Sequence, residues 1–316
     1  MPRPAPLNLR HLRRYSVTER PSKVAKETFA RPTPAGSSFR TFYGNLPKVL
    51  AAERFQRLVE ALAVAHRRRR TVLAMLGAHV LKVGLSPLLV DLIERRVITA
   101  LAMTGSGIIH DFELAYQGQT SEEVAEALAD GSFGMARETA DVLNAAIQEG
   151  AKKDRGIGES VGRMIEEKKL RYRHGSLFAA AYRAGIPATV HVAIGTDIIH
   201  QHASCNGEAL GKGSLLDFHR LTQVVGTVGE EAVVLNVGSA VILPEVFLKA
   251  VSISRNLGRP VKGFTAANLD MIQHYRPHQN VLTRPTALGG QAIALTGHHE
   301  ILVPLLYAAL MEKLER

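Results

Sequence analysis

The chain has 316 residues, of which 46% are hydrophobic, and it contains one cysteine, Cys205, and no tryptophan. This length and apolar content suit one large α/β domain, alone or with extensions. A single cysteine excludes internal disulfides and zinc sites with several cysteines, and it favours a reducing compartment. No run approaches the roughly 20 apolar residues of a membrane span, and the N-terminus lacks the apolar core of a secretory signal. We therefore expect a soluble, cytoplasmic protein with no membrane partner.

The formal net charge of +10 is concentrated near the N-terminus. Residues 1–70 contain 16 Lys/Arg and 4 Asp/Glu, so residues 71–316 carry a net charge of −2. We interpret the Pro- and Arg-rich residues 1–44 as a basic arm and residues 45–316 as a Rossmann-like α/β domain. A run of four arginines at residues 67–70 closes a helix expected from Leu46, where the helix dipole favours cations. No aromatic residues interleave with these arginines, so we do not expect nucleic-acid binding.

Residues 71–113 carry the most informative pattern in the chain. Apolar runs at 71–76 and 97–103 predict two strands, and residues 86–95 between them predict a helix. This β-α-β unit ends at Thr104-Gly105-Ser106-Gly107. Ligands of open α/β sheets bind beyond the carboxyl ends of the strands, where glycine lets the backbone approach a phosphate or ribose. The segment is therefore a candidate ligand-binding turn. It can equally be an ordinary tight turn, because His110 stands where a full dinucleotide fingerprint has its third glycine.

The alternation of helices and strands continues and predicts a mostly parallel sheet with helices on both faces. Thr120 and Glu123 form a capping-box pattern for a helix running toward Ala136, and residues 137–148 continue as helix. The charge-rich residues 152–173 predict an exposed helix between loops. Small or hydroxylated residues follow each expected strand, which favours a ligand-binding edge. Three further strands are expected at 188–194, 232–237 and 260–264, ending at Gly195-Thr196-Asp197, Gly238-Ser239 and Thr265-Ala266.

The order of these strand-end motifs resembles that of the deoxyhypusine synthase family, from about Gly77 to Leu310. The family's Thr-Ala-Gly-Gly turn and the acidic residues after it correspond to residues 104–111. Its Leu-Thr-Asp corresponds to residues 195–197, and its Gly-Gly-Gly turn to residues 238–240. Its Asn-Thr-Ala segment with a following aspartate corresponds to residues 264–270, and its Pro-Leu-Leu to residues 304–306.

The resemblance implies a Rossmann-like fold, a homotetramer with active sites between subunits, an NAD cofactor, and transfer of an aminobutyl group from spermidine to a lysine of a translation factor. Among the matching positions, Asp197 is the best candidate for a ribose contact, because a carboxylate accepts both hydrogen bonds of a vicinal diol. The implied cofactor-binding residues are Thr104, Gly105, Ser106, Gly107, Thr196, Asp197, Gly238, Thr265, Ala266 and Asp270.

Three departures from the family pattern argue against the family's own reaction. The family's catalytic lysine falls near Arg284, and an arginine stays protonated and cannot form an imine. The His-His-x-x-x-Asn of the spermidine pocket would fall around residues 244–248 and is missing. Ile109-His110 replaces the carboxylate pair after the glycine turn. We therefore do not expect the chain to make deoxyhypusine.

Histidines and one lysine offer replacement chemistry at the same edge. His110 and His202 are candidate proton shuttles, because imidazoles exchange protons near neutral pH. Lys82 follows the first strand among apolar neighbours, where a lysine loses proton affinity and can act as the nucleophile of imine chemistry. Alternatively, the histidines only fill a polar cleft, and Lys82 reaches solvent or a phosphate. A further alternative is a metal site formed by His200, His202 and either His110 or Asp111. In that case His200 and His202 are expected on one face of a strand.

The sequence thus predicts a deoxyhypusine synthase-like, NAD-dependent transferase that acts on a small amine or polyamine-like substrate. Two other classes remain open. One is a metal-assisted hydrolase or lyase that uses the histidines, and the other is a nucleotide-binding protein without catalysis whose arm docks a partner. We expect a homotetramer, or at least a dimer, because an arginine-rich arm needs a neighbour to pack on.

Overall fold

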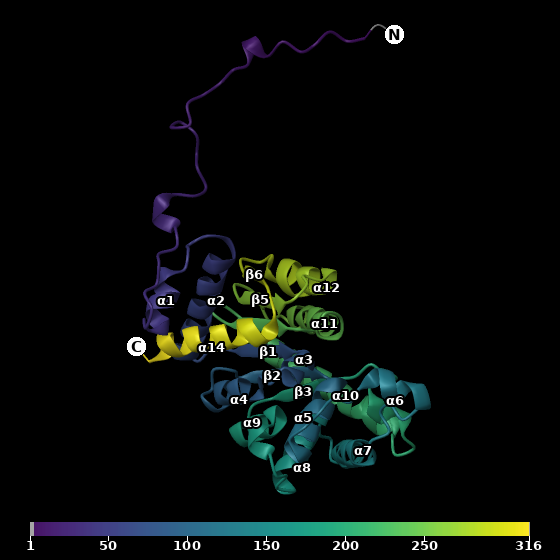
Figure 1. The fold of residues 1–316 in the computed structure, drawn as a ribbon. Helices are drawn as coiled ribbons and strands as arrows, with labels where there is room; N and C mark the ends of the chain where they lie inside the picture. Colours follow the sequence, from purple (N-terminus) through teal and green to yellow (C-terminus); the bar gives the residue numbers. More distant parts are fainter. Residues whose placement is uncertain (1–2, 316) are drawn as a thin grey trace.

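The computed structural model describes residues 3–315, which form an entirely parallel, six-stranded sheet flanked by helices (Figure 1). The strand order is β3-β2-β1-β4-β5-β6. This confirms the predicted Rossmann-like α/β fold with helices on both faces. The strands are β1 (Val72–Leu76), β2 (Ala100–Thr104), β3 (Ala188–His191), β4 (Val233–Val237), β5 (Thr265–Asp270) and β6 (Gln291–Thr296).

Helices connect the strands and cover the two faces of the sheet. The α-helices are α1 (Phe39–Asn45), α2 (Leu50–Arg67), α3 (His79–Lys82), α4 (Ser86–Glu94), α5 (Gly105–Gln117), α6 (Val124–Asp130), α7 (Arg137–Lys152), α8 (Ile157–Glu167), α9 (Leu177–Ala184), α10 (Gly207–Val225), α11 (Ile242–Asn256), α12 (Tyr275–Pro277), α13 (Arg284–Thr286) and α14 (His299–Leu314). Short 3-10 segments are η1 (Leu9–His11), η2 (Lys26–Thr28), η3 (Arg173–Gly175) and η4 (Ile198–Gln201), and η5 (His278–Thr283) is a π-helical turn.

Alternate residues of the strands feed two apolar cores. Val72, Ala74 and Leu76 of β1 pack with side chains of α2, α4, α5, α7, α8, α9 and α14. Leu73 and Met75 pack with side chains of α10 and α11 on the other face. All five residues are buried. Parallel strands that are covered on both faces are uniformly apolar, which explains why β1, β2 and β4 could be expected from apolar runs.

The strand order creates a switch point between β1 and β4. From β1 the chain proceeds outward through β2 and β3, and it then returns to the other side of β1 to add β4, β5 and β6. The two backbones nearly touch there, because a Cβ atom on Gly77 would lie 2.0 Å from the carbonyl oxygen of Gly238. In open α/β sheets, the crevice at the switch point is where ligands bind.

The fifth expected strand, at residues 260–264, is wrong, and β6 was not predicted. Val261 and Gly263 have φ angles of +34° and +73°, which bend the chain before β5. β5 itself reads Thr-Ala-Ala-Asn-Leu-Asp, so small and polar residues replace the apolar run that marks the other strands. β6 lies at the edge of the sheet and is only partly buried, so its pattern is also weak.

The helix expected to open at Thr120 is wrong as well. α6 begins only at Val124, with Glu123 as its N-cap, and it ends at Asp130, followed by Gly131 in a left-handed conformation. Ser121 has a φ angle of +71°, which is incompatible with a helix starting at Thr120. The Thr120 hydroxyl instead donates a hydrogen bond to Glu113.

The N-terminal segment extends away from the rest of the chain, and nearly all residues from 3 to 38 are exposed (Figure 1). The boundary expected at residue 44 falls near the end of α1, which is tied to α14 by an Arg40–Glu312 ion pair of 2.6 Å. Arg68 and Arg70 of the arginine run both pair with Glu231. Among residues 3–315, no helix has the length and apolarity needed to cross a membrane.

Candidate functional site

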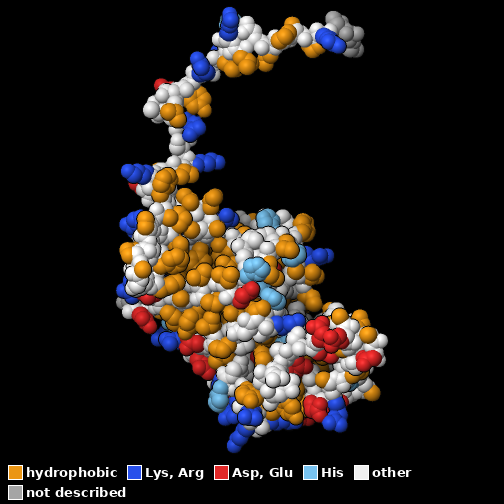
Figure 2. All heavy atoms as spheres, viewed as in Figure 1, with side chains coloured by type: hydrophobic (Ala, Val, Ile, Leu, Met, Phe, Trp, Pro, Cys, Tyr) orange, Lys and Arg blue, Asp and Glu red, His pale blue; other side chains and the backbone are white. Residues whose placement is uncertain are grey.

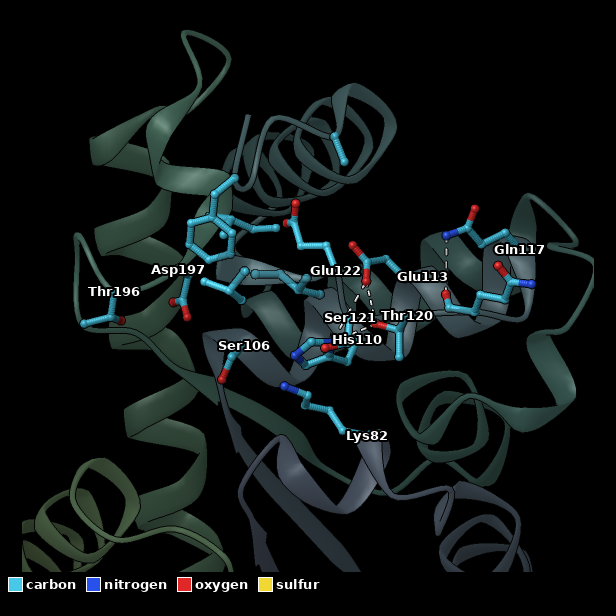
Figure 3. A pocket seen from close by; sticks show the side chains of 16 residues that line it. Lys82, Ser106, His110, Glu113, Gln117, Thr120, Ser121, Glu122, Thr196 and Asp197 are labelled. Atoms are coloured by element: carbon cyan, nitrogen blue, oxygen red, sulfur yellow. Dashed lines mark hydrogen bonds and ion pairs between the residues drawn. The ribbon is translucent and has the colours of Figure 1, made fainter. Parts of the chain in front are cut away.

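A cavity of about 430 Å³ opens at the carboxyl ends of β2 and β3 (Figure 3). α5, which follows β2 directly, forms one wall, and the loop after β3 and the segment around α6 form the others. Glu113, Thr120 and Glu122 contribute polar groups that the sequence did not single out. The cavity brings together five residues expected from the sequence, namely Lys82, Ser106, His110, Thr196 and Asp197.

Gly105 and Gly107 begin a helix, so the tight turn expected at residues 104–107 is wrong. A Cβ atom on Gly105 would lie 2.1 Å from Oδ2 of Asp197, and one on Gly107 would lie 2.9 Å from Cβ of Met103. Contacts within the chain therefore require both glycines. The hydroxyl of Thr104, at the end of β2, lies 2.9 Å from that of Ser106.

Asp197 and His200 form a buried polar pair beside the cavity. The Asp197 side chain accepts a hydrogen bond from the backbone N–H of His200. Nδ1 of His200 accepts from the backbone N–H groups of Gly195 and Asp197, at 3.0 and 3.3 Å, so the neutral ring carries its proton on Nε2. Among the described residues, Oδ2 of Asp197 and Nε2 of His200 are buried without hydrogen-bond partners, and they lie 3.9 Å apart. A hydroxyl group would reach both atoms only from the side and after the surrounding wall moves, because 3.9 Å leaves no room for an oxygen between them.

Burial raises the pKa of Asp197 from 3.8 to about 6, and the backbone N–H of Ser106 opposes this shift. The carboxylate is thus less stable in the free protein than in water. A ligand that donates a hydrogen bond to Oδ2 would favour the ionised form.

A hydrogen-bonded chain orients His110 in the cavity wall (Figure 3). The Thr120 hydroxyl donates to Oε2 of Glu113 at 2.5 Å, and Nδ1 of His110 lies 2.7 Å from the same hydroxyl oxygen. Because a carboxylate only accepts, the Thr120 proton is committed to Glu113, and His110 donates from Nδ1. Nε2 of His110 is then free to accept a proton. Burial lowers the pKa of His110, Glu113 opposes the shift, and Lys82 adds to it.

Lys82 reaches the cavity from the end of α3, and Figure 3 shows its side chain directed toward Ser106 and His110. The preceding Val80 and Leu81 are buried in the core, whereas Lys82 is exposed. The apolar surroundings expected for this amine are therefore wrong, because its apolar neighbours in sequence point into the protein.

His202 and Asp111 do not join the cavity. Residues 198–201 form a 3-10 helix, so the strand expected to carry His200 and His202 is wrong. Nε2 of His202 lies 2.8 Å from the carbonyl oxygen of Gly134. Asp111 is fully buried and caps the first turn of α9. Across residues 3–315, no group of three or more His, Cys, Asp or Glu side chains is arranged to hold a metal ion.

Two expected cofactor residues lie at the wrong edge of the sheet. Because β5 begins at Thr265 and ends at Asp270, Thr265 and Ala266 lie at the amino edge, away from the cavity. Gly238 follows β4 and Asp270 ends β5, so both lie at the carboxyl edge, as expected. Arg284, at the position of the family's lysine, donates to Oδ1 of Asn280 at 2.6 Å.

Two histidines whose pairing was not expected from the sequence lie at the switch point. His299 begins α14, is 1% exposed, and packs so closely on Gly238 that a Cβ atom there would lie 2.9 Å from its ring. Nε2 of His299 lies 3.2 Å from the carbonyl oxygen of Leu269, and its Nδ1 lies 2.9 Å from Nδ1 of His79. His79 could have been noticed as a site residue, because it lies two residues after Gly77 at the end of β1. Its pairing could not, because its partner is 220 residues away in the sequence.

No family model matches the sequence, and no curated protein matches it significantly. Solved structures share its fold at low sequence identity. A LOR/SDH candidate protein from Methanococcus maripaludis S2 is 16% identical over 85% of this chain and 72% of its own, with a TM-score of 0.54. A deoxyhypusine synthase candidate from Entamoeba histolytica is 10% identical over 88% of this chain and 94% of its own, with a TM-score of 0.53.

AgrE, in its ternary complex with ornithine and NAD⁺, is 13% identical over 84% of this chain, with a TM-score of 0.53. This chain spans only about a third, 34%, of that AgrE chain. Together these similarities show a fold shared with a deoxyhypusine synthase-like protein. They establish the architecture alone, and the chemistry must be argued from the site.

Proposed function

We propose that this chain binds NAD at the carboxyl edge of its sheet and acts on a small amine or polyamine-like substrate, as a deoxyhypusine synthase-like transferase that does not make deoxyhypusine. The observation that carries the proposal is the cavity beside β2 and β3, which Ser106, His110 and several carboxylates line, with the unpaired Oδ2 of Asp197 buried in its wall.

NAD fits the residues of this edge. A ribose hydroxyl that reaches Oδ2 of Asp197 and Nε2 of His200 from the cavity side, after a small movement of the wall, would satisfy two buried polar atoms that are otherwise unpaired. Gly77 and Gly238 meet backbone to backbone at the switch point, which is where dinucleotides cross α/β sheets. The NAD⁺ found in AgrE, which shares the fold, supports the same class of cofactor.

The charge of the cavity favours a cationic substrate. Glu113, Glu122 and Asp197 line it, and Lys82 is the only Lys or Arg among its lining residues. Figure 2 shows further acidic side chains gathered around α6, which closes the cavity. A cleft lined by one sign of charge concentrates ligands of the opposite sign, so an ammonium group is the fitting substrate feature.

When bound, NAD would accept a hydride from the carbon that carries the substrate amine. His110 is placed to accept a proton at Nε2, because the Glu113–Thr120 chain fixes its Nδ1–H. Lys82 lies beside His110 and can attack the resulting iminium carbon once deprotonated, forming a lysine imine as ammonia leaves. Arg284 cannot take this role, so the family's own reaction is not expected.

We also propose that the chain assembles with further copies of itself. Figure 2 shows apolar side chains gathered over α1, α2 and α14. Phe42, Leu50 and Ile301 on these elements are 41%, 76% and 57% exposed. Exposed apolar patches of this kind are typical of subunit contacts, which supports the expected homotetramer.

The test combines calorimetry with turnover. NAD should bind, and an amine series of diamines, spermidine, ornithine and arginine should yield NADH with at least one member. Glu113→Gln should weaken amine use while NAD binding stays unchanged, and Glu159→Gln, remote from the cavity, is the matched control. If no dinucleotide binds, the proposal is wrong. If NAD binds but no amine is turned over, the proposed reaction is wrong and the proposed cofactor stands.

A further inference from the structure

We infer that a second cavity, at the amino edge of the sheet, binds a small sugar phosphate, either free or as part of a nucleotide. This cavity has a volume of about 480 Å³. Among its lining residues, Thr71 directly precedes β1, Ala100 begins β2 and Pro187 directly precedes β3. It therefore lies across the amino ends of three neighbouring strands. The acidic cavity lies at the opposite edge, so this inference does not depend on the proposed function.

All charged side chains that line this second cavity are arginines. Arg69 and Arg70 come from the end of the arginine run, and Arg220 comes from α10. Of residues 3–315, no Asp or Glu is among those that line it. The candidate site, by contrast, is lined by three carboxylates and one lysine. A concave surface of one sign of charge concentrates ligands of the opposite sign, so an anion is the fitting ligand at the amino edge.

The guanidinium groups have donors left for such an anion. Within residues 3–315, the side chain of Arg69 makes no hydrogen bond or ion pair. Arg70 lies 3.6 Å from Glu231, which is too far for a hydrogen bond. Arg220 donates from Nη1 alone, to Glu159. The free N–H groups of these three planar forks can bind one phosphate through several charge-assisted hydrogen bonds.

These arginine side chains do not cap the helices that end at this edge. α2 ends at Arg67, and the carbonyls of its last turn accept from the backbone N–H groups of residues 68–70. α10 ends at Val225, and the carbonyl of Val224 accepts from both the backbone N–H and the hydroxyl of Thr227. Local groups thus satisfy carbonyls that would otherwise attract the guanidinium groups. The arginines consequently remain available to a ligand.

The threonine hydroxyls of this cavity favour a ligand that has hydroxyl groups of its own. Thr227 donates its proton to the carbonyl of Val224, so Thr71 is the donor across the 2.8 Å contact between the two hydroxyls. Thr99 donates to the carbonyl of Val72 at 3.2 Å. Because these protons are used within the chain, Thr71 and Thr99 offer lone pairs to the cavity. Lone pairs repel phosphate oxygens but accept hydrogen bonds from sugar hydroxyls.

Apolar groups complete the wall of this cavity. Ala100 is buried, and Pro187 and Val224 are half-buried. Such groups pack against the C–H face of a sugar ring or against a base. The arginines match a phosphate, the threonine lone pairs match hydroxyls and the apolar wall matches a ring. Their combination fits a sugar phosphate better than a bare inorganic anion.

Calorimetry with ribose-5-phosphate, AMP, ribose and inorganic phosphate tests the inference. We expect both phosphate esters to bind more tightly than ribose or inorganic phosphate, at a site that depends on Arg69. Arg69→Gln should weaken the binding of both esters about tenfold, because charge-assisted hydrogen bonds are lost. Thr71→Val keeps the shape of the side chain but removes the acceptor. It should weaken the binding of both esters and leave that of inorganic phosphate unchanged.

Arg67→Gln is the matched control, because Arg67 carries the same charge in the same run, pairs with Glu60 at 3.2 Å and does not line the cavity. It should bind both esters as the wild type does, and thermal unfolding should show that all three variants fold. Equal affinity for inorganic phosphate and the esters, unchanged binding in Arg69→Gln, or no saturable binding would overturn the inference. Arg69-dependent binding of a single-stranded oligonucleotide that is tighter than that of AMP would also overturn it, because the site would then serve nucleic acid.

Discussion

Replacing Asp197 with asparagine should weaken NAD binding by roughly 10- to 150-fold without unfolding the protein. Asparagine keeps one oxygen as acceptor but replaces the other with an NH₂ group, which cannot accept from a ribose hydroxyl. A hydrogen bond to a charged group contributes about 1.5–3 kcal/mol, which converts to that range in Kd. The residue is buried and Oδ2 has no partner in the free protein, so the loss should fall on the complex.

The assay is calorimetry of wild type and Asp197→Asn with NAD, alongside thermal unfolding of both. Because burial raises the pKa of Asp197 to about 6, the wild-type carboxylate gains a proton as pH falls through 6. The affinity of the wild type for NAD should therefore fall as the pH drops through 6, because the hydrogen bond to the ionised carboxylate is lost. The affinity of Asp197→Asn should not change over this pH range. His200→Phe is a companion variant that removes the neighbouring donor and should also weaken binding. An unchanged Kd in Asp197→Asn would refute the ribose contact.

Three further predictions follow from the same contacts. Gly105→Ala should destabilise the protein by about 1–3 kcal/mol in denaturant unfolding, because the added Cβ would lie 2.1 Å from Oδ2 of Asp197. The same contact should weaken NAD binding. A more stable variant would contradict this packing. Borohydride added during incubation with NAD and a substrate amine should leave an adduct on Lys82 by mass spectrometry, and full turnover by Lys82→Arg would remove Lys82 from the chemistry. Light scattering at micromolar concentration should show a tetramer, or at least a dimer, and a monomer would contradict the proposed assembly.

The sequence could predict most of the fold because its central strands are apolar over their whole length. β1, β2 and β4 are covered on both faces, so burial leaves a continuous signal. β5 lacked this signal, since Asn268 pairs with Asn236 inside the sheet and both are completely buried. Asparagines that pair across neighbouring strands can replace apolar residues, and no local pattern reveals such a pair.

The candidate site could be predicted only where single residues follow a strand. Asp197 and His110 fit that rule, and both line the cavity. Thr265 and Ala266 were misplaced because an error in one strand boundary moves a residue from one sheet edge to the other. The pairing of His79 with His299 joins two distant segments through ring nitrogens, so it depends on the tertiary structure alone.

The position of Asp197 also indicates that the first turn of α5 is not a phosphate site in this chain. Its carboxylate lies against Gly105 and interacts with the N–H of Ser106, so a negative charge already occupies the first turn of α5. A phosphate would be repelled from that helix end, although its glycines resemble a phosphate turn. Under the proposed function, the first turn of α5 therefore lies beside a ribose hydroxyl and not beside a phosphate.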